Sequence, residues 1–153
     1  MLNTQQPGAV EGLLIESELR ELEEAVRSAQ ATGRSLLVAT HHPLLPVGCD
    51  WLDDIGVKNA DDALHRLAPL GKHAVVISGH VHQDSAQAYE GVQCLTSPST
   101  CVQFAPHSAD FRVDALAPGC RVLTLHPEGR WETAVERVTD QLFPVDLNSS
   151  GYA

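Results

Sequence analysis

Two short apolar runs in this chain each end in histidine, and they constrain its fold more than any other feature. The first run, Ser35–Thr40, is followed by His41–Pro43, and the second, Val75–Ser78, is followed by Gly79–His82. Continuous apolar runs of this length are typical of strands in a parallel sheet that is covered on both faces. Because ligands of open α/β sheets lie beyond the carboxyl ends of the strands, the pattern predicts imidazoles gathered at one sheet edge.

The segments around these runs predict an α/β fold. Apolar residues recur at three- and four-residue intervals over Ser17–Thr32, which predicts an amphipathic helix that ends at Gly33. Asn59 is expected to cap a second helix, which runs from Ala60 to Leu67 or Leu70. Strand, helix and strand together form a βαβ unit, whose crossover should be right-handed.

The chain after the second histidine run is expected to form β-hairpins. One hairpin pairs Ala86–Tyr89 with Val92–Leu95 across a Glu-Gly turn. The other pairs Arg121–His126 with Trp131–Val138. The remaining residues, 139–153, are expected to form a loosely attached C-terminal tail.

Composition limits the classes of protein to which the chain can belong. Its 153 residues suit one domain, and its net charge of −10 argues against nucleic acid as a partner. It has neither the roughly 20-residue apolar run of a membrane span nor a signal peptide, so a cytoplasmic location is expected. The four cysteines lack C-x-x-C spacing and are expected to be reduced and buried.

The histidines at the two strand ends have the chemistry of metal ligands. In an extended segment the side chains of His80 and His82 project to the same side, so both rings can face one pocket, with His41 as a third ligand. Neutral imidazole binds Zn, Mn and Fe. Three histidines could form a mononuclear zinc site with an open position for water. Alternatively, the rings are structural and form hydrogen bonds to backbone at the rim of the sheet.

Several motifs resemble those of a known family. Thr40–Pro43 and Gly79–His82 resemble the last two metal motifs of the calcineurin-like metallophosphoesterases. The stretches Pro46–Asp61, Pro98–Phe111 and Pro118–Arg121 are similar to the bacterial cyclic-AMP phosphodiesterase branch of that family. The resemblance extends from about Asn3 to Val138.

The resemblance implies a fold and a metal site. The expected fold is the C-terminal half of a four-layer αββα sandwich, with residues 1–138 as a partial phosphoesterase domain and 139–153 as the tail. The complete family site holds two divalent ions, Fe, Mn or Zn, with a bridging hydroxide as the nucleophile. The resemblance assigns His41 and His80 to one metal and His82 to the other. His42 would lie behind the ligands, face the substrate or be structural.

The chain also departs from the family pattern. The early D-x-H motif, the bridging aspartate, the G-N-H motif and the family's catalytic histidine are absent from it, so its catalytic residues are unknown. Five carboxylates lie after the first histidine pair and do not match the missing motifs, so they are expected to lie in a solvated loop or to cap a helix: Asp50, Asp53, Asp54, Asp61 and Asp62.

Three explanations account for the missing motifs. The chain is a fragment or a truncated gene, or it is completed by a second polypeptide or an exchanged dimer, or it is an inactive descendant; we expect the first. The predicted function is metal-dependent hydrolysis of 3',5'-cyclic nucleotides or another phosphodiester. The rival functions are a non-catalytic metal-binding or interaction module and a mononuclear zinc hydrolase.

Overall fold

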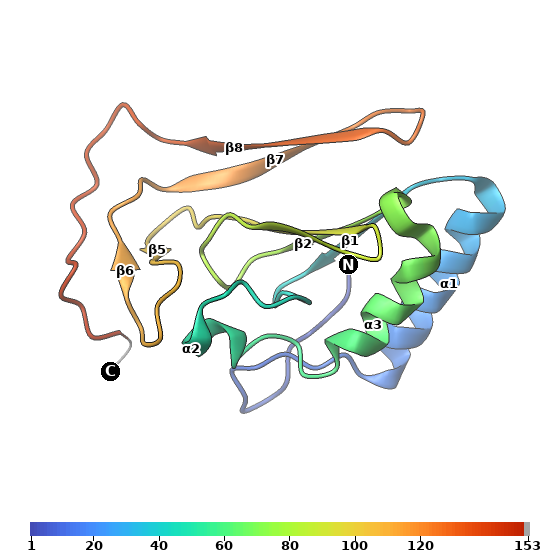
Figure 1. Cartoon of the computed structure of the whole chain (residues 1–153), viewed down its shortest axis with the longest axis horizontal. Coiled ribbons are helices and arrows are strands. Elements are labelled where there is room, and N and C mark those ends of the chain that lie inside the picture. The colour runs from blue at the N-terminus through green and yellow to red at the C-terminus, as the bar shows by residue number, and fades with distance from the viewer. Residues whose placement is uncertain (152–153) are drawn as a thin grey trace.

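A computed structural model describes residues 1–151 and has a mixed α/β fold (Figure 1). The elements in chain order are α1 Glu16–Thr32, β1 Leu36–Thr40, α2 Asp50–Asp53, α3 Ala60–Leu67, the 3-10 helix η1 Ala68–His73, β2 Ala74–Ser78, β3 Ala86–Tyr89, β4 Val92–Thr96, β5 Gln103–Phe104, β6 Val113–Asp114, β7 Gly119–Leu125 and β8 Trp131–Arg137. The predicted helices, strands and hairpins are therefore present within a few residues of their expected bounds.

The main sheet has four strands in the order β1-β2-β4-β3. Strands β1 and β2 are parallel, with Thr40 opposite Ser78, and α3 lies between them in the chain, which confirms the βαβ unit. Strands β3 and β4 form the expected hairpin. Strand β4 also pairs in parallel with β2, so the loop that follows Thr96 leaves the sheet at the same edge as the two histidine motifs.

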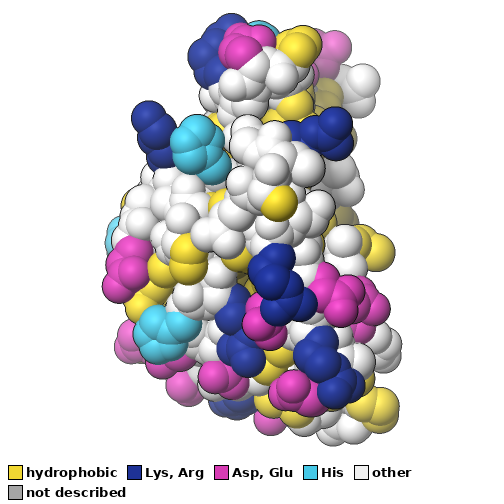
Figure 2. Space-filling model, turned by 90° about the vertical axis from the view of Figure 1, so that its right-hand side faces the viewer, with side chains coloured by type: hydrophobic (Ala, Val, Ile, Leu, Met, Phe, Trp, Pro, Cys, Tyr) yellow, Lys and Arg dark blue, Asp and Glu magenta, His cyan; other side chains and the backbone are white. Residues whose placement is uncertain are grey.

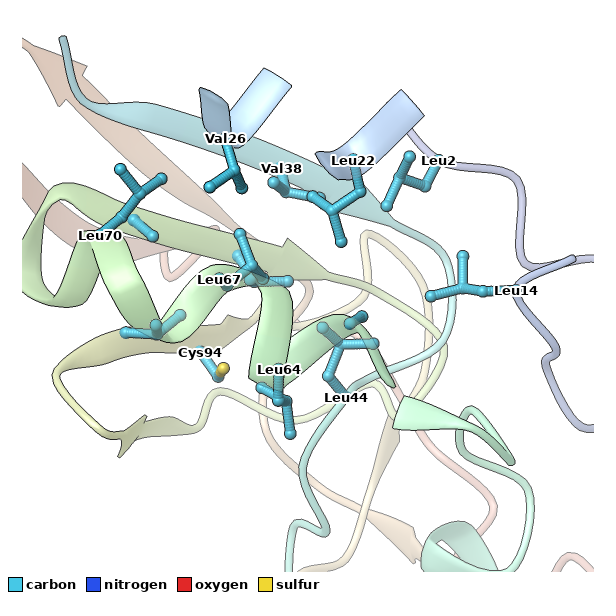
Figure 3. Packing of buried hydrophobic residues seen from close by; sticks show 14 of the residues in the cluster. Leu2, Leu14, Leu22, Val26, Val38, Leu44, Leu64, Leu67, Leu70 and Cys94 are labelled. Carbon is cyan, nitrogen blue, oxygen red and sulfur yellow. The ribbon is translucent and has the colours of Figure 1, made fainter. Parts of the chain in front are cut away.

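Helices α1 and α3 cover one face of this sheet and form the main hydrophobic core (Figure 3). Leu22 and Val26 of α1 lie close to Val38 of β1 and Leu67 of α3, and all four are buried. Burial of a leucine or valine side chain stabilises a fold by about 1.5–3 kcal/mol. Gly33 ends α1 in the left-handed region, at a φ of 66°, as its place after the apolar pattern predicted.

The opposite face of the sheet is covered less completely. The β7–β8 hairpin runs along this side, away from α1 and α3 (Figure 1). Leu37 of β1 nevertheless stays 40% exposed, and Ile77 of β2 is only partly buried. The prediction that this sheet is covered on both faces is therefore wrong for β1, where Leu37 lines a cavity of about 550 Å³ together with Leu125 and Trp131 of the hairpin.

Two local predictions are also wrong. The Asn59 side chain does not cap α3 but pairs with the backbone of Leu14, where its Oδ1 accepts from the N–H and its Nδ2 donates to the carbonyl, both at 2.9 Å. Of the four cysteines, Cys49 and Cys94 are buried, whereas Cys101 and Cys120 are exposed. For Asn59, a residue distant in the sequence, Leu14, decides the outcome.

The C-terminal tail is attached rather than loose. Val145 packs against a second hydrophobic cluster, which contains Leu52, Val81, Phe104 and Val113. This cluster lies at the opposite end of the sheet from η1, near α2 and the β5–β6 pair (Figure 1). The tail was expected to be loose, and the structure holds it at Val145, whereas Leu142 and Leu147 on either side of this residue are exposed.

The surface carries charges of both signs. On the face shown in Figure 2, lysine and arginine side chains lie beside acidic ones. One such pair is Arg27 and Glu23 on α1, whose side chains lie 2.8 Å apart. Over residues 1–151, no helix is both long enough and apolar enough to cross a membrane.

Candidate metal centre

The ends of β1 and β2 are joined by hydrogen bonds, which bring the two histidine motifs together. The Thr40 and Ser78 hydroxyls lie 2.9 Å apart, and the Gly79 N–H donates to the His41 carbonyl at 3.0 Å. The next side chains, those of His41 and His80, therefore emerge side by side at the carboxyl edge of the sheet. This is the edge at which open α/β sheets bind ligands.

His41 and His80 form a close ring pair, a term used below for these two residues. His41 Nε2 lies 3.1 Å from His80 Nδ1, and the ring centroids are 4.9 Å apart. His80 has a φ of 64°, an unusual conformation for a residue other than glycine. The other nitrogen of its ring, Nε2, is buried and has no hydrogen-bond partner in the part of the chain that the structure describes.

The ring of His80 is held neutral. Burial and, to a smaller extent, the nearby His42, His41 and His82 rings together lower its pKa from the ordinary value of 6.5 to about 4. Neutral imidazole has a lone pair, which a metal ligand needs. The Nδ1 atom of this ring, which faces His41 Nε2, is therefore the His80 nitrogen placed to share an ion with His41.

His42 lies beside the ring pair but is occupied on both nitrogens. Its Nε2 lies 3.0 Å from the Val10 carbonyl, and its Nδ1 lies 2.7 Å from the Thr4 hydroxyl. A carbonyl only accepts, so Nε2 carries the proton and Nδ1 accepts from the hydroxyl. We call these contacts the His42 anchor. They leave His42 no free nitrogen, and burial lowers the pKa of its ring.

Gly12 belongs to the same anchor. A Cβ at this position would lie 2.7 Å from the His42 ring, closer than packed side chains come. The Gly12 N–H donates to the Gly56 carbonyl, and its own carbonyl accepts from the Lys58 N–H. The segment between Thr4 and Gly12 is thus fixed across the buried side of the histidines.

His82 is held in a different way. Its Nδ1 donates to the Val102 carbonyl at 2.9 Å, and its ring stacks on Phe104 with centroids 4.3 Å apart and planes 2° from parallel. In the neutral ring the remaining nitrogen, Nε2, then carries the lone pair. Burial lowers the pKa of His82, the Val102 hydrogen bond raises it, and His41 lowers it.

The segment that carries His80 and His82 is not extended, contrary to the expectation from their spacing. His82 has a φ of 49°, and both residues lie in the left-handed region. The two rings therefore do not project in parallel as neighbours on one strand face. His80 contacts the rings of His41 and His42, whereas His82 contacts the aromatic cluster around Phe104.

The histidine group fits the donor requirements of a transition-metal ion. One ligand atom from each of His41, His42 and His80 can be chosen so that all lie within 4.8 Å of one another. Two nitrogens that bind one ion at roughly 2.1 Å lie no more than about 4.2 Å apart. The 3.1 Å distance in the ring pair meets this limit. The hydrogen bonds of His42 argue against it as a ligand, and the structure does not include His82 in this group.

The carboxylates after the first histidine pair do not join this group among the described residues. The Asp53 carboxylate accepts from the backbone N–H groups of Val47, Gly48 and Cys49, at 2.6–3.0 Å. It therefore stabilises the loop that follows His42. Solvation was the expectation for this residue, and the structure gives it a structural role instead.

The structure adds neighbours of the histidines that sequence reasoning missed. Glu18 and Glu21 of α1 line a cavity of about 610 Å³ together with His41, His42 and His80. Their spacing on the helix indicated only a charged surface. The contact of Thr4 with His42 spans 38 residues. No local pattern signals such a contact.

Comparison with known proteins supports the family suggested by the motifs. The chain is 45% identical over 152 residues to the 3',5'-cyclic adenosine monophosphate phosphodiesterase CpdA of Pseudomonas aeruginosa, covering 99% of this chain and 55% of that protein. It is 40% identical to the CpdA of Escherichia coli K12, covering 54% of it. The chain thus spans about half the length of the curated relatives that it matches. No family model matches it.

A solved structure supports the fold. A dimetal phosphatase from Danio rerio superposes with a TM-score of 0.52 at 22% identity, covering 67% of this chain and 32% of that one. The fold is therefore of the metallophosphoesterase type. By sequence, nearly the whole chain is similar to about half of these bacterial cyclic-AMP phosphodiesterases.

Proposed function

We propose that this chain supplies the His41, His80 and His82 ligands of a metal-dependent phosphodiesterase that hydrolyses 3',5'-cyclic nucleotides, cyclic AMP among them. The ring pair, in which His41 Nε2 and His80 Nδ1 lie 3.1 Å apart at the carboxyl edge of the sheet, carries this proposal. The names of the relatives support the substrate class, since they are cyclic-AMP phosphodiesterases.

The histidines of this chain would have separate roles in binding metal and in holding the site together. His41 and His80 would hold one divalent ion, Fe, Mn or Zn, and His82 would present its Nε2 to a second. Bound ions of this kind lower the pKa of water and stabilise charge on a phosphoryl group. The Val102 carbonyl fixes the tautomer of His82, as partners behind metal-bound histidines commonly do. His42 would hold the Thr4–Gly12 segment against the site.

The remaining parts of the site would come from outside these 153 residues. We take residues 1–138 as part of a phosphoesterase domain and 139–153 as its tail. The D-x-H and G-N-H motifs and the catalytic histidine of the family would be supplied by a longer chain, a second polypeptide or a second copy. The half-length match to the curated relatives supports this division.

One observation favours a second candidate, a non-catalytic metal-binding module. Within residues 1–151, no carboxylate belongs to the group of side chains that could hold a metal. A mononuclear zinc hydrolase, the third candidate, would need one tightly bound zinc per chain and activity without a partner.

The test is hydrolysis of cyclic AMP by the purified chain with added Mn²⁺ or Zn²⁺, over a range of protein concentrations. His80→Ala is the blank, and His65→Ala on the exposed side of α3 is the matched control. Activity above the blank that rises steeply with concentration supports assembly of the site from two copies. Activity proportional to concentration with one zinc per chain favours the mononuclear hydrolase. Bound metal without hydrolysis at any concentration means that the chain is a module or that its missing motifs come from a longer chain or a second polypeptide, and hydrolysis on addition of a polypeptide that carries the D-x-H and G-N-H motifs would distinguish these two.

A further inference from the structure

Another cavity is lined by Phe104, the residue on which the His82 ring stacks. Its volume is about 530 Å³, within the range of small-molecule sites. One wall is the loop Thr100–Val102, which leaves β4 at the edge of the sheet where the histidines emerge. A second wall is the tail segment Phe143–Asp146.

The cavity and His82 share two neighbours. Phe104 lines the cavity and stacks on the His82 ring. Val102 also lines the cavity, and its carbonyl accepts the hydrogen bond from His82 Nδ1. Phe104 and the Val102 peptide therefore form the wall between the cavity and His82.

The walls suit a flat, uncharged ring system. Phe104 and Phe111 contact each other edge to face, with centroids 5.5 Å apart, and Phe143 stays 37% exposed beside them. Stacking on aromatic side chains is the usual way in which proteins hold a nucleobase without reading its sequence. No lysine or arginine is among the described residues of this lining, which does not suit a phosphate group.

One charged side chain in the lining favours a base with an amino group. The Asp146 carboxylate lines the cavity, and its Oδ1 accepts from the Asn148 N–H at 3.0 Å. A carboxylate accepts hydrogen bonds but cannot donate them. It can accept from the exocyclic amine of adenine, whereas the oxygen in the same position of hypoxanthine offers no hydrogen.

We propose that this cavity binds the base of a nucleotide, with Phe143 stacking on it and Asp146 accepting from its amino group. The inference rests on the proposed function in one respect: the histidines would hold the phosphate of the same nucleotide. The C-terminal tail is then part of the substrate site rather than an appendage. Base binding itself needs neither metal nor hydrolysis.

The test is binding of adenosine, which has no phosphate, to the metal-free 153-residue chain by isothermal titration calorimetry. We expect saturable 1:1 binding, weaker binding of inosine, and about tenfold weaker adenosine binding in Phe143→Ala. Leu142→Ala is the matched control, because this neighbouring tail residue is 91% exposed and does not line the cavity. Asp146→Asn should reduce the preference for adenosine over inosine.

Cysteine reactivity provides a second measurement that does not depend on a variant. Cys101 and Cys120 are both free and exposed, but only Cys101 lines the cavity, since Cys120 lies on β7. Adenosine should slow alkylation of Cys101, measured peptide by peptide, and leave Cys120 unchanged. No saturable binding, or equal protection of both thiols, would overturn the proposal.

These outcomes are independent of the hydrolysis experiment. His80→Ala should abolish hydrolysis and leave adenosine binding unchanged. If adenosine binds but cyclic AMP is not hydrolysed, the cavity binds the base, and the chain alone does not catalyse the reaction. If cyclic AMP is hydrolysed but adenosine does not protect Cys101, the base lies elsewhere and this inference is wrong.

Discussion

His41 and His42 are neighbours in the sequence and lie in opposite environments. His42 is 6% exposed and has a hydrogen-bond partner on each ring nitrogen. His41 is exposed, and its Nε2 faces the ring of His80. The strand end delivers both rings, but the Thr4–Gly12 segment occupies only one of them. His42 therefore has a structural role in the anchor, whereas His41, as part of the ring pair, is available to a ligand.

The largest expected effect concerns the ring pair. His80→Ala removes one proposed ligand and should weaken Mn²⁺ or Zn²⁺ binding by at least about 100-fold, since even partners behind the ligands contribute 10–100-fold. Isothermal titration calorimetry on the chain measures the affinity. His65→Ala should bind metal as the unaltered chain does. Equal metal affinity in both variants would remove His80 from the site.

The next effect concerns the anchor. His42→Ala leaves the Thr4 hydroxyl and the Val10 carbonyl without their buried partner and should lower the free energy of unfolding by about 2–3 kcal/mol. The number of metal ions bound per folded chain should stay the same. Urea denaturation measures stability, and elemental analysis of the folded fraction measures the metal. Loss of metal with stability unchanged would reverse the roles assigned to His41 and His42.

A smaller effect is expected at the glycine that contacts the anchor. Gly12→Ala places a methyl group 2.7 Å from the His42 ring, so the ring or the segment must shift, at about 1–2 kcal/mol of unfolding free energy. Gly56→Ala is the control, because its Cβ would meet the Pro43 carbonyl at an ordinary 3.5 Å. If urea denaturation gives equal losses for the two variants, the ring at position 42 is not tightly held.

The smallest effect is the pH dependence of stability. Burial lowers the pKa of His42, His80 and His82, that of His80 to about 4, whereas in the unfolded chain each ring titrates near 6.5. Below that value the unfolded state binds more protons, so stability is fully present above pH 6.5 and declines as the pH falls toward 4.

The slope should stay below about 1.4 kcal/mol per pH unit for each ring, because solvent screens these partly exposed groups. Urea denaturation of the metal-free chain between pH 4 and 7.5 measures it. His80→Ala should have a shallower slope than the unaltered chain. A stability that rises on acidification would contradict the neutral state of these rings.

The sequence predicted the parts of this molecule that depend on local patterns. The α1 face, the two strands that end in histidine, and both hairpins follow from periodicity and turn residues. The outcomes it could not predict depend on contacts between distant segments. Asn59 pairs with Leu14 instead of capping α3, and the tail is held by Val145.

The candidate site shows the same division. Spacing and resemblance identified His41, His80 and His82 as candidate ligands. The positive φ angles of His80 and His82, which set the directions of their rings, were not predictable from spacing, because an extended segment was assumed. The two ring nitrogens of His42 form hydrogen bonds with Thr4 and Val10, which lie in a segment without regular structure.

The most direct test of the account is a Zn²⁺ titration of the chain labelled with ¹⁵N-histidine, with the two ring nitrogens of each residue followed by long-range NMR. The account predicts that His41, His80 and His82 change at their unprotonated nitrogens as metal is added. His42 should keep its proton on Nε2, bonded to Val10, throughout the titration. A metal-induced change in the Nδ1 signal of His42, with His80 unmoved, would contradict the division between anchor and ring pair on which the proposed function depends.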